Sequence, residues 1–122
     1  MKVIYLNVVD RKAPEVLDVD DELETYQRLI GCDCIDIVRR EIGGKPYRII
    51  CDDEGYFKKD AFFISAVSNI RGNCPLVGNL VICGDYVKDG ELTGLTKKEE
   101  GLILQEIRFS PIAGHYMLIM SA

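Results

Sequence analysis

The sequence of 122 residues contains no tryptophan and only one histidine, and none of its apolar runs is long enough to cross a membrane. A membrane-spanning helix needs about 20 predominantly apolar residues, and the longest apolar segments here are interrupted by glycine, asparagine or histidine. The glycine-rich patterns that hold nucleotide phosphates, G-x-G-x-x-G and glycine-lysine followed by serine or threonine, do not occur either. These absences argue against a membrane protein and against the common nucleotide-hydrolysing folds.

Side-chain combinations that carry catalysis are equally scarce. Any imidazole chemistry would depend on His115, which lies between Gly114 and Tyr116 in an apolar run. No nucleophile can be paired with it from the sequence, and a lone histidine in such a setting is more often a packed or surface residue than a catalyst. We therefore expect a protein without enzymatic activity, and we assign it no catalytic residue and no cofactor.

The five cysteines do not have the spacing of a metal site. They are Cys32, Cys34, Cys51, Cys74 and Cys83. Paired zinc ligands are typically separated by at least two residues, whereas one residue separates the first pair here. Cys51 and Cys83 lie in apolar strand-like patterns, where a free cysteine behaves as a small hydrophobic residue. With an odd cysteine count and no signal-peptide pattern after Met1, we expect no metal, reduced thiols and a cytoplasmic location.

The overall composition is that of an ordinary folded protein. Hydrophobic residues make up 48% of the chain and charged residues 29%, which is too apolar for a disordered chain. The length fits one domain, so we predict a single α+β domain over residues 1–122. The formal net charge of −5 repels phosphate backbones, which argues against direct nucleic-acid binding and is compatible with a basic protein partner or with simple solubility.

Several segments have the apolar alternation of β-strands. The clearest are residues 2–9, 34–42, 47–51 and 76–83. Gly43 and Gly44 are suited to a tight turn, so the middle two form a predicted hairpin. Residues 15–19 suit a short pairing strand or an extended approach to a helix, and residues 56–73 suit a loop with a short helix. Residues 112–120 are either a final strand or an exposed apolar tail, and in the second case a homodimer through this segment is expected.

Two helices are predicted, over residues 22–30 and 97–108. A residue pair at the start of each fits a capping box, in which two side chains satisfy backbone N–H groups: Asp21 with Glu24, and Thr96 with Glu99. Gly31 is placed to end the first helix in a left-handed conformation. Together the elements predict an α+β fold, a small and mostly antiparallel sheet with two helices packed on it.

Three consecutive carboxylates form the first candidate binding element. Asp52, Asp53 and Glu54 precede Gly55 and follow a predicted strand. They lack the alternating spacing of an EF-hand loop, so a calcium site is not indicated. A solvated β-turn is one interpretation, and a loop that contacts a basic protein partner is the other.

Basic residues on the predicted hairpin form the second candidate. Arg39, Arg40, Lys45 and Arg48 lie close together there, and we expect Arg40 and Arg48 to share an exposed face with Tyr47 nearby. Arginine binds phosphate and carboxylate groups through paired N–H donors, so these residues are a candidate site for a small anion. A solvated sheet face is the alternative.

Three motifs occur in order within residues 23–84: YQRLIGCDCIDIVRRE, IICDDEGYF and LVGNLVICG. In this order and at these separations they resemble a family of small uncharacterised proteins, catalogued as a domain of unknown function and associated with phages, conjugative elements and Gram-positive gut bacteria. The resemblance covers about half of the chain. It implies an α+β fold and a mobile-element setting, and it brings no activity or catalytic residues with it.

Two functional hypotheses follow. The first is a non-enzymatic interaction protein of a phage or mobile element that inhibits a bacterial defence system, of anti-CRISPR or antirestriction type. In this case its acidic surface, including Asp52, Asp53 and Glu54, would bind a protein partner, for example a basic nucleic-acid-binding effector. The second is a module that binds or sequesters a small anionic, nucleotide-like ligand through residues Arg39, Arg40, Tyr47 and Arg48.

Overall fold

The computed structural model describes residues 1–55, 63–68, 75–85, 87–88 and 90–121. Its largest element is a five-stranded sheet in which every neighbouring pair is antiparallel. The strand order across this sheet is β2 (Glu15–Asp18), β1 (Lys2–Leu6), β7 (Leu80–Gly84), β4 (Lys45–Asp52) and β3 (Ile35–Ile42). The two strands furthest apart in sequence, β1 and β7, therefore lie side by side at its centre.

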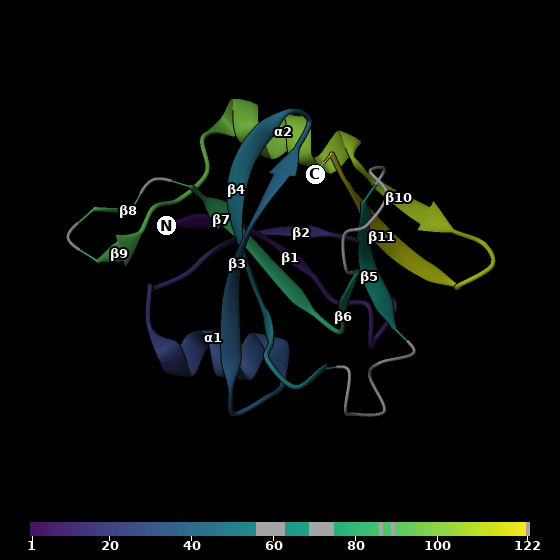
Figure 1. Ribbon diagram of the computed structural model, residues 1–122, viewed down its shortest axis with the longest axis horizontal. Coiled ribbons are helices and arrows are strands. Elements are labelled where there is room, and N and C mark those ends of the chain that lie inside the picture. The colour runs from purple at the N-terminus through teal and green to yellow at the C-terminus, as the bar shows by residue number, and fades with distance from the viewer. Residues whose placement is uncertain (56–62, 69–74, 86, 89, 122) are drawn as a thin grey trace.

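A second sheet of four strands lies beside the first (Figure 1). Its order is β10 (Ile107–Ser110), β11 (His115–Met120), β5 (Ile64–Ser68) and β6 (Leu76–Val77). β11 and β5 are parallel, and the other two pairs are antiparallel. A separate two-stranded ribbon consists of β8 (Val87–Lys88) and β9 (Glu91–Leu92). The predicted α+β class with mostly antiparallel strands is confirmed, but the strands are divided between sheets instead of forming one.

Two helices complete the fold in the part of the chain that the structure describes, α1 (Leu23–Ile30) and α2 (Lys97–Gln105), and they lie at opposite ends of the molecule in Figure 1. Among the described residues, neither helix is long and apolar enough to cross a membrane.

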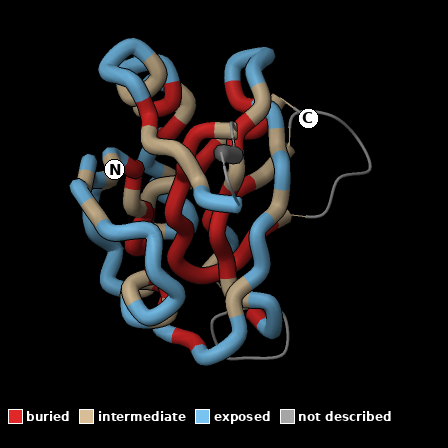
Figure 2. Tube along the Cα trace, turned by 90° about the vertical axis from the view of Figure 1, so that its left-hand side faces the viewer, coloured by how far each residue is buried: buried red, intermediate tan, exposed pale blue. Residues whose placement is uncertain are grey.

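Side chains of the five-stranded sheet alternate between two separate apolar cores, as the period of two in a β-strand requires. One face packs against α1, and this core contains Val3, Tyr26, Ile30, Ile50, Val81 and Cys83. The opposite face packs against α2 and the four-stranded sheet, and this core contains Ile4, Leu6, Ile49, Leu80, Ile82, Ile103, Leu118 and Met120. Both faces of the central strands are therefore covered, and buried residues run along them in Figure 2.

The two helix starts differ from each other. Thr96 forms the predicted capping box: its side chain accepts from the Glu99 backbone N–H at 3.2 Å, and the Glu99 carboxylate accepts from the Thr96 N–H at 3.0 Å. The box predicted for Asp21 is absent, because α1 begins after Glu22 without a side-chain cap. Asp21 instead accepts hydrogen bonds from the Tyr26 hydroxyl (2.6 Å) and the Leu92 N–H (2.9 Å). Its carboxylate thus ties α1 to β9.

Local backbone conformation and side-chain hydrogen bonds determine where α1 ends and where β1 ends. Gly31 ends α1 with φ of 81°, as predicted. β1 is shorter than the predicted strand over residues 2–9, because Asn7 begins a turn: its side chain accepts from the Asp10 N–H at 3.1 Å and donates to the Asp10 carboxylate at 3.0 Å. The short strand predicted over residues 15–19 is present as β2.

Three predicted elements are corrected. The single strand over residues 76–83 is two strands, β6 and β7, because Gly78 adopts φ of 75° and sends the chain from one sheet into the other. Within residues 56–73, the described part from 64 to 68 is strand β5 and not helix, and the remainder lies outside the described residues except Phe63. α2 ends at Gln105, and the last predicted helical residues belong to α2's C-cap and to β10.

The segment 112–120 contains strand β11 and does not form an exposed apolar tail. β11 lies between β10 and β5, and the side chains of Leu118 and Met120 are fully buried. Strand β11 therefore does not supply the exposed apolar surface on which a homodimer through this segment depended, although Ile112, at the start of the segment, is fully exposed. The homodimer stays a prediction. Exposed apolar side chains lie just before β11 instead, at Phe109 and Ile112.

Candidate functional site

The β3–β4 hairpin carries every residue of the two candidate sites, apart from two in the turn that follows it. Gly43 and Gly44 form its tight turn with φ of 61° and 82°, a conformation that residues with a Cβ rarely adopt. Pairing runs from Ile42 opposite Lys45 at the turn to Ile35 opposite Asp52 at the open end. The predicted hairpin is confirmed, and its register decides which side chains share a face.

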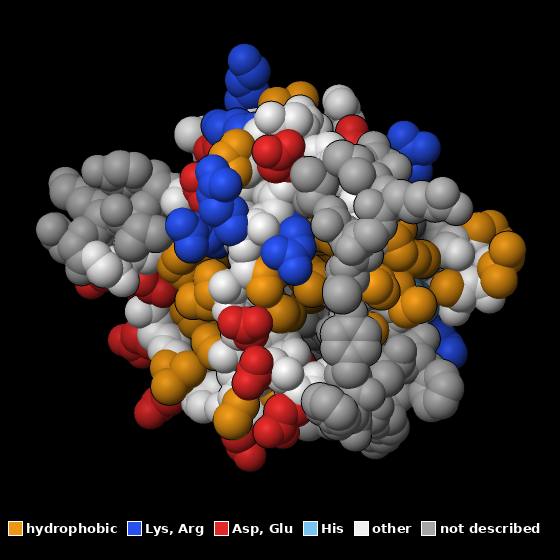
Figure 3. Space-filling model, viewed as in Figure 1, with side chains coloured by type: hydrophobic (Ala, Val, Ile, Leu, Met, Phe, Trp, Pro, Cys, Tyr) orange, Lys and Arg blue, Asp and Glu red, His pale blue; other side chains and the backbone are white. Residues whose placement is uncertain are grey.

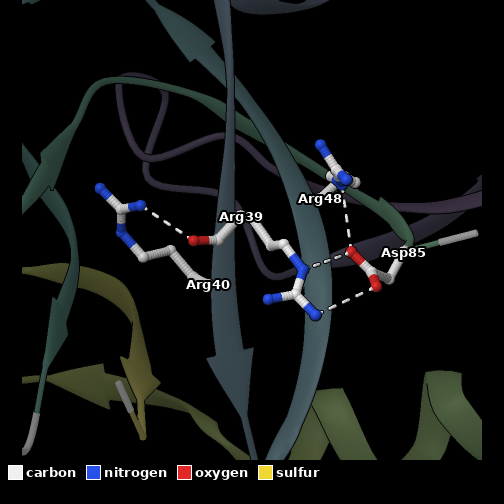
Figure 4. A network of polar contacts seen from close by, with 4 residues as sticks. All are labelled: Arg39, Arg40, Arg48 and Asp85. Atoms are coloured by element: carbon white, nitrogen blue, oxygen red, sulfur yellow. Dashed lines mark hydrogen bonds and ion pairs between the residues drawn. The ribbon is translucent and has the colours of Figure 1, made fainter.

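Arg39 and Arg48 lie directly opposite each other and share one carboxylate (Figure 4). The Nε atoms of both arginines donate to Oδ1 of Asp85, at 3.0 Å from Arg39 and 3.1 Å from Arg48, and Arg39 Nη2 also reaches Oδ2 at 3.4 Å. The hydrogen bond from Arg39, followed by that from Arg48, lowers the pKa of Asp85 below its usual value. Two like charges that would repel across the strands are thus held together by an acid from the end of β7.

Arg40 and Tyr47 lie opposite each other on the other face of the hairpin. Arg40 donates to the backbone oxygen of Arg39 at 2.9 Å, and its guanidinium points away from the arginine pair in Figure 4. Tyr47 is 1% exposed, so its ring belongs to the core. The expectation that Arg40 shares a face with Arg48 is wrong, because a tight two-residue turn pairs Arg48 with Arg39.

A cleft of about 370 Å³ lies beside Asp85, between the ends of β4 and β7 and the start of α2. Its lining residues are Lys45, Pro46, Gly84, Asp85, Thr93, Gly94 and Glu99. Lys45 Nζ and Glu99 Oε2 form an ion pair at 2.7 Å along one wall. Burial opposes ionisation of Glu99, but hydrogen bonds from Lys45 and Thr96 outweigh it and lower the pKa of that carboxyl, while the bond to Glu99 raises the pKa of Lys45.

The open end of the hairpin is acidic. Its carboxylates come from both strands and their flanks: Asp33, Asp36, Asp52, Asp53 and Glu54. The Glu54 N–H donates to the Asp52 side chain at 2.9 Å, and the Asp53 N–H donates to the Cys34 carbonyl at 3.0 Å, so backbone bonds fix the turn. In the part of the chain that the structure describes, no lysine or arginine forms an ion pair with Asp33, Asp36, Asp53 or Glu54.

A smaller cleft of about 150 Å³ opens between this acidic end and β6. Its walls combine charged and apolar groups: Asp36, Val38, Arg40, Cys51, Asp52, Asp53, Pro75, Leu76 and Val77. The pKa of the Cys51 thiol reflects this environment. Burial first, and then the negative charge of Asp36 with smaller contributions from Asp52 and Asp53, raise its pKa to about 12, against a lowering by Arg40.

The remaining sequence candidates are placed in the interior or are separated from one another. His115 is 2% exposed, and its Nε2 lies 2.8 Å from the Ile64 carbonyl, which identifies Nε2 as the donor. It packs beside Phe63 as a core residue of the four-stranded sheet. Cys74 lies outside the described residues. Among those described, no three histidine, cysteine or acidic side chains lie where they could hold a metal ion.

Two contributors to these surfaces were missed from the sequence. Asp36 sits within the hairpin as one polar residue of an alternating strand, and that alternation was a usable signal for its exposure. Asp85 is far along the chain from the arginines that it joins. The pairing of β7 with β4 places Asp85 beside these arginines, and no local sequence pattern predicts this position.

Comparisons with known proteins identify a family but no function. No curated protein and no solved structure shows significant similarity to this chain. A family model does match, and it extends beyond the segment 23–84 that suggested a resemblance. Residues 1–108 match the model of the domain of unknown function DUF3846, and the chain therefore belongs to this family.

Proposed function

We propose that this protein is a non-enzymatic binding protein that engages a basic protein partner through the acidic end of the β3–β4 hairpin, formed by Asp33, Asp36, Asp52, Asp53 and Glu54. The observation that carries the proposal is the separation of charge along one hairpin. Carboxylates occupy its open end, while Arg39, Arg40, Lys45 and Arg48 lie toward its glycine turn, where Glu41 is the single acidic residue of the two strands.

Charge is also separated over the surface around the hairpin. On the face seen in Figure 3, most lysine and arginine side chains lie in the upper half, and most acidic side chains lie in the lower half. A single-sign cluster attracts partners of opposite charge and repels those of like charge, so it contributes to the rate and specificity of binding. The cleft of about 150 Å³ beside it offers apolar walls next to carboxylates, which suits the stem and charged head of a partner's lysine or arginine.

The partner class that best fits an acidic surface is a protein whose own surface binds nucleic acid. Covering such a surface would block DNA or RNA, and inhibition of a bacterial defence nuclease by a phage or mobile-element protein is the setting that we propose. This setting implies a cytoplasmic location. It rests on the charge pattern and on the resemblance described above, and not on any property of the family.

The test is affinity purification with the tagged protein from lysates of bacteria that carry defence nucleases, followed by mass spectrometry. Three acidic residues are neutralised in the test variant, Asp36→Asn, Asp53→Asn and Glu54→Gln. A matched control removes the same charge beside α1, through Asp20→Asn, Glu22→Gln and Glu24→Gln. We expect a stoichiometric partner with the wild-type protein and with the control, and weakening by about tenfold or more with the test variant.

The purified partner then allows two sharper measurements. Affinity should fall as salt rises, because the charges lie at the surface, and the protein should displace DNA or RNA from the partner. Equal retention of the partner by both triple variants would contradict the assignment of the acidic end. Absence of any stoichiometric partner from such lysates would contradict the setting.

A further inference from the structure

We propose that the opposite end of the same hairpin binds a small phosphate monoester of about the size of a mononucleotide, with its phosphate on Arg39 and Arg48 and the rest of the molecule in the adjoining cleft. This goes beyond the proposed protein interaction, because it concerns a different surface and a different class of ligand.

The arginine pair carries more positive charge than its carboxylate neutralises. Among the described residues, the ion pairs of the two guanidinium groups go to one acid, Asp85, which leaves one positive charge in excess. Cross-strand partners of like charge destabilise a sheet, so the arrangement is not one that packing alone favours. A second anion would complete the charge balance, and a phosphate is matched in geometry to the paired N–H donors of arginine.

Donor capacity remains on both arginines. Arg48 contacts Asp85 through Nε alone, so its two terminal nitrogens form no hydrogen bond to the described residues. Arg39 uses Nε and Nη2, and its Nη1 forms no hydrogen bond within the described part of the chain. The Arg39 side chain is 55% exposed and the Arg48 side chain is 33% exposed, so both can be reached from solvent. The shared carboxylate holds both groups in place, which reduces the entropy lost when a ligand binds.

The cleft beside Asp85 holds the part of the ligand other than its phosphate. Its volume of about 370 Å³ lies within the range of small-molecule sites. Gly84 and Gly94 are among its lining residues, and the neighbours of both glycines leave no room for a Cβ. The Lys45–Glu99 ion pair supplies a donor and an acceptor on one wall, which are partners for hydroxyl or amide groups of a polar molecule.

The register places Arg39 and Arg48 on the opposite face of the hairpin from Arg40 and Tyr47, which suggests a matched control. Arg40 lies next to Arg39 in sequence but on the opposite face, with its guanidinium directed away. If general surface charge drew the anion, removing Arg40 would weaken binding as much as removing Arg48. If the pair acts as a site, only changes at Arg39, Arg48 or Asp85 should matter.

The experiment is isothermal titration calorimetry of the full chain in a phosphate-free buffer. Three probes are used: adenosine 5′-monophosphate, inorganic phosphate and adenosine. We expect saturable binding of the monophosphate, weaker binding of inorganic phosphate, and none of adenosine. Arg48→Ala should weaken monophosphate binding by about tenfold or more, the effect of losing a charge-assisted contact, and Arg40→Ala should leave it unchanged.

A gain-of-binding variant guards against misfolding as an explanation. Asp85→Asn keeps the side-chain shape and an Oδ1 atom that can still accept from both arginines, but it removes the competing negative charge, so the monophosphate should bind several-fold more tightly. Misfolding cannot produce such a gain. The proposal is overturned if the monophosphate does not bind at millimolar concentration, if Arg40→Ala weakens binding as much as Arg48→Ala, or if Asp85→Asn abolishes it. Equal affinity for the monophosphate and inorganic phosphate would show that the cleft does not bind the rest of the ligand, and it would contradict that part of the proposal.

Discussion

The hydroxyl of Tyr5 accepts a hydrogen bond from the side-chain amide of Asn79 at 3.3 Å, joining β1 to the residue that precedes β7. The same hydroxyl donates to the backbone carbonyl of Leu29 at 2.6 Å, close to the end of α1. Burial first, and then the negative charge of Asp10, raise the pKa of Tyr5, so the hydroxyl stays protonated and able to donate. One phenol thus links the central strands to the helix that covers them.

Removing this hydroxyl should destabilise the fold measurably. Tyr5→Phe removes both hydrogen bonds of the hydroxyl and leaves the Asn79 amide and the Leu29 carbonyl with only the longer bond of 3.4 Å between them. We expect a loss of about 1–2 kcal/mol in the free energy of unfolding. Denaturant titration followed by circular dichroism measures it. Tyr116→Phe is the control, because within the described residues the Tyr116 hydroxyl makes no hydrogen bond. Equal losses in both variants would show that the Tyr5 network contributes nothing specific.

Stability should fall at acid pH in a way that depends on Glu99. The pKa of this carboxyl is below its ordinary value of 4.5 in the folded protein, so its contribution is complete above that pH and is lost as the pH falls through the lower folded value. Glu99→Gln should therefore be less stable than the wild type near neutral pH and should lose less stability between about pH 5 and pH 3.

The measurement is the free energy of unfolding at a series of pH values. Glu100→Gln, which changes a neighbouring acid of α2 that has no ion pair among the described residues, serves as the control. Parallel pH profiles for Glu99→Gln and the wild type would contradict the assignment of this linkage to the Lys45–Glu99 pair.

Two glycines should respond in opposite directions to the same substitution. A Cβ on Gly84 would lie 2.9 Å from the Gly94 carbonyl oxygen and 2.9 Å from Thr93 Oγ1, so Gly84→Ala should cost about 1–3 kcal/mol. Gly101 lies within α2 with nothing within 4 Å of an added Cβ, so Gly101→Ala should stabilise the protein by about 0.5–1 kcal/mol. Thermal unfolding of the two variants compares them directly, and a stabilising Gly84→Ala would rule out the close backbone approach.

The cysteines should differ sharply in reactivity. Burial, as the largest cause, raises the pKa of both Cys51 and Cys83 to about 12, whereas Cys34 is exposed. Only the thiolate reacts, so iodoacetamide at about pH 8 should modify Cys34 first and should modify Cys51 and Cys83 only when the protein opens. Peptide mapping by mass spectrometry assigns the sites. Modification of Cys51 or Cys83 as fast as Cys34 in the native protein would contradict the burial described here.

The elements that the sequence predicted correctly are ones with local signals, although one local signal, the capping box of Asp21 with Glu24, was wrong. The β3–β4 hairpin follows from alternation around Gly43 and Gly44, and the start of α2 follows from Thr96 and Glu99, because each uses contacts between residues close in the chain. The split between β6 and β7 was missed, since the run is apolar on both sides of Gly78 and only the sheets to which its halves pair distinguish them.

For the candidate sites too, local register was predictable from the sequence, whereas contacts between distant elements were not. Counting outward from the two-residue turn would have placed Arg39 opposite Arg48, so that error was one of register and could have been avoided. Asp85 and the cleft could not have been derived, because they arise where β7, the segment after β9 and α2 meet. Strand β5 is a further case: its short sequence suits a helix or a strand, and its pairing with β11 decides.

The parallel pairing of β5 with β11 also bears on the order in which the protein folds. Ala66 and Leu118 are partners in this ladder, so the second sheet cannot close until the intervening chain, including β7 and α2, has been placed. Contacts over such long separations require loop closure before they yield stabilisation, and this slows folding. The β3–β4 hairpin, whose pairing is local, is therefore the expected nucleus. The pairings of β1 with β7 and of β11 with β5, which join residues far apart in the chain, are the expected late steps.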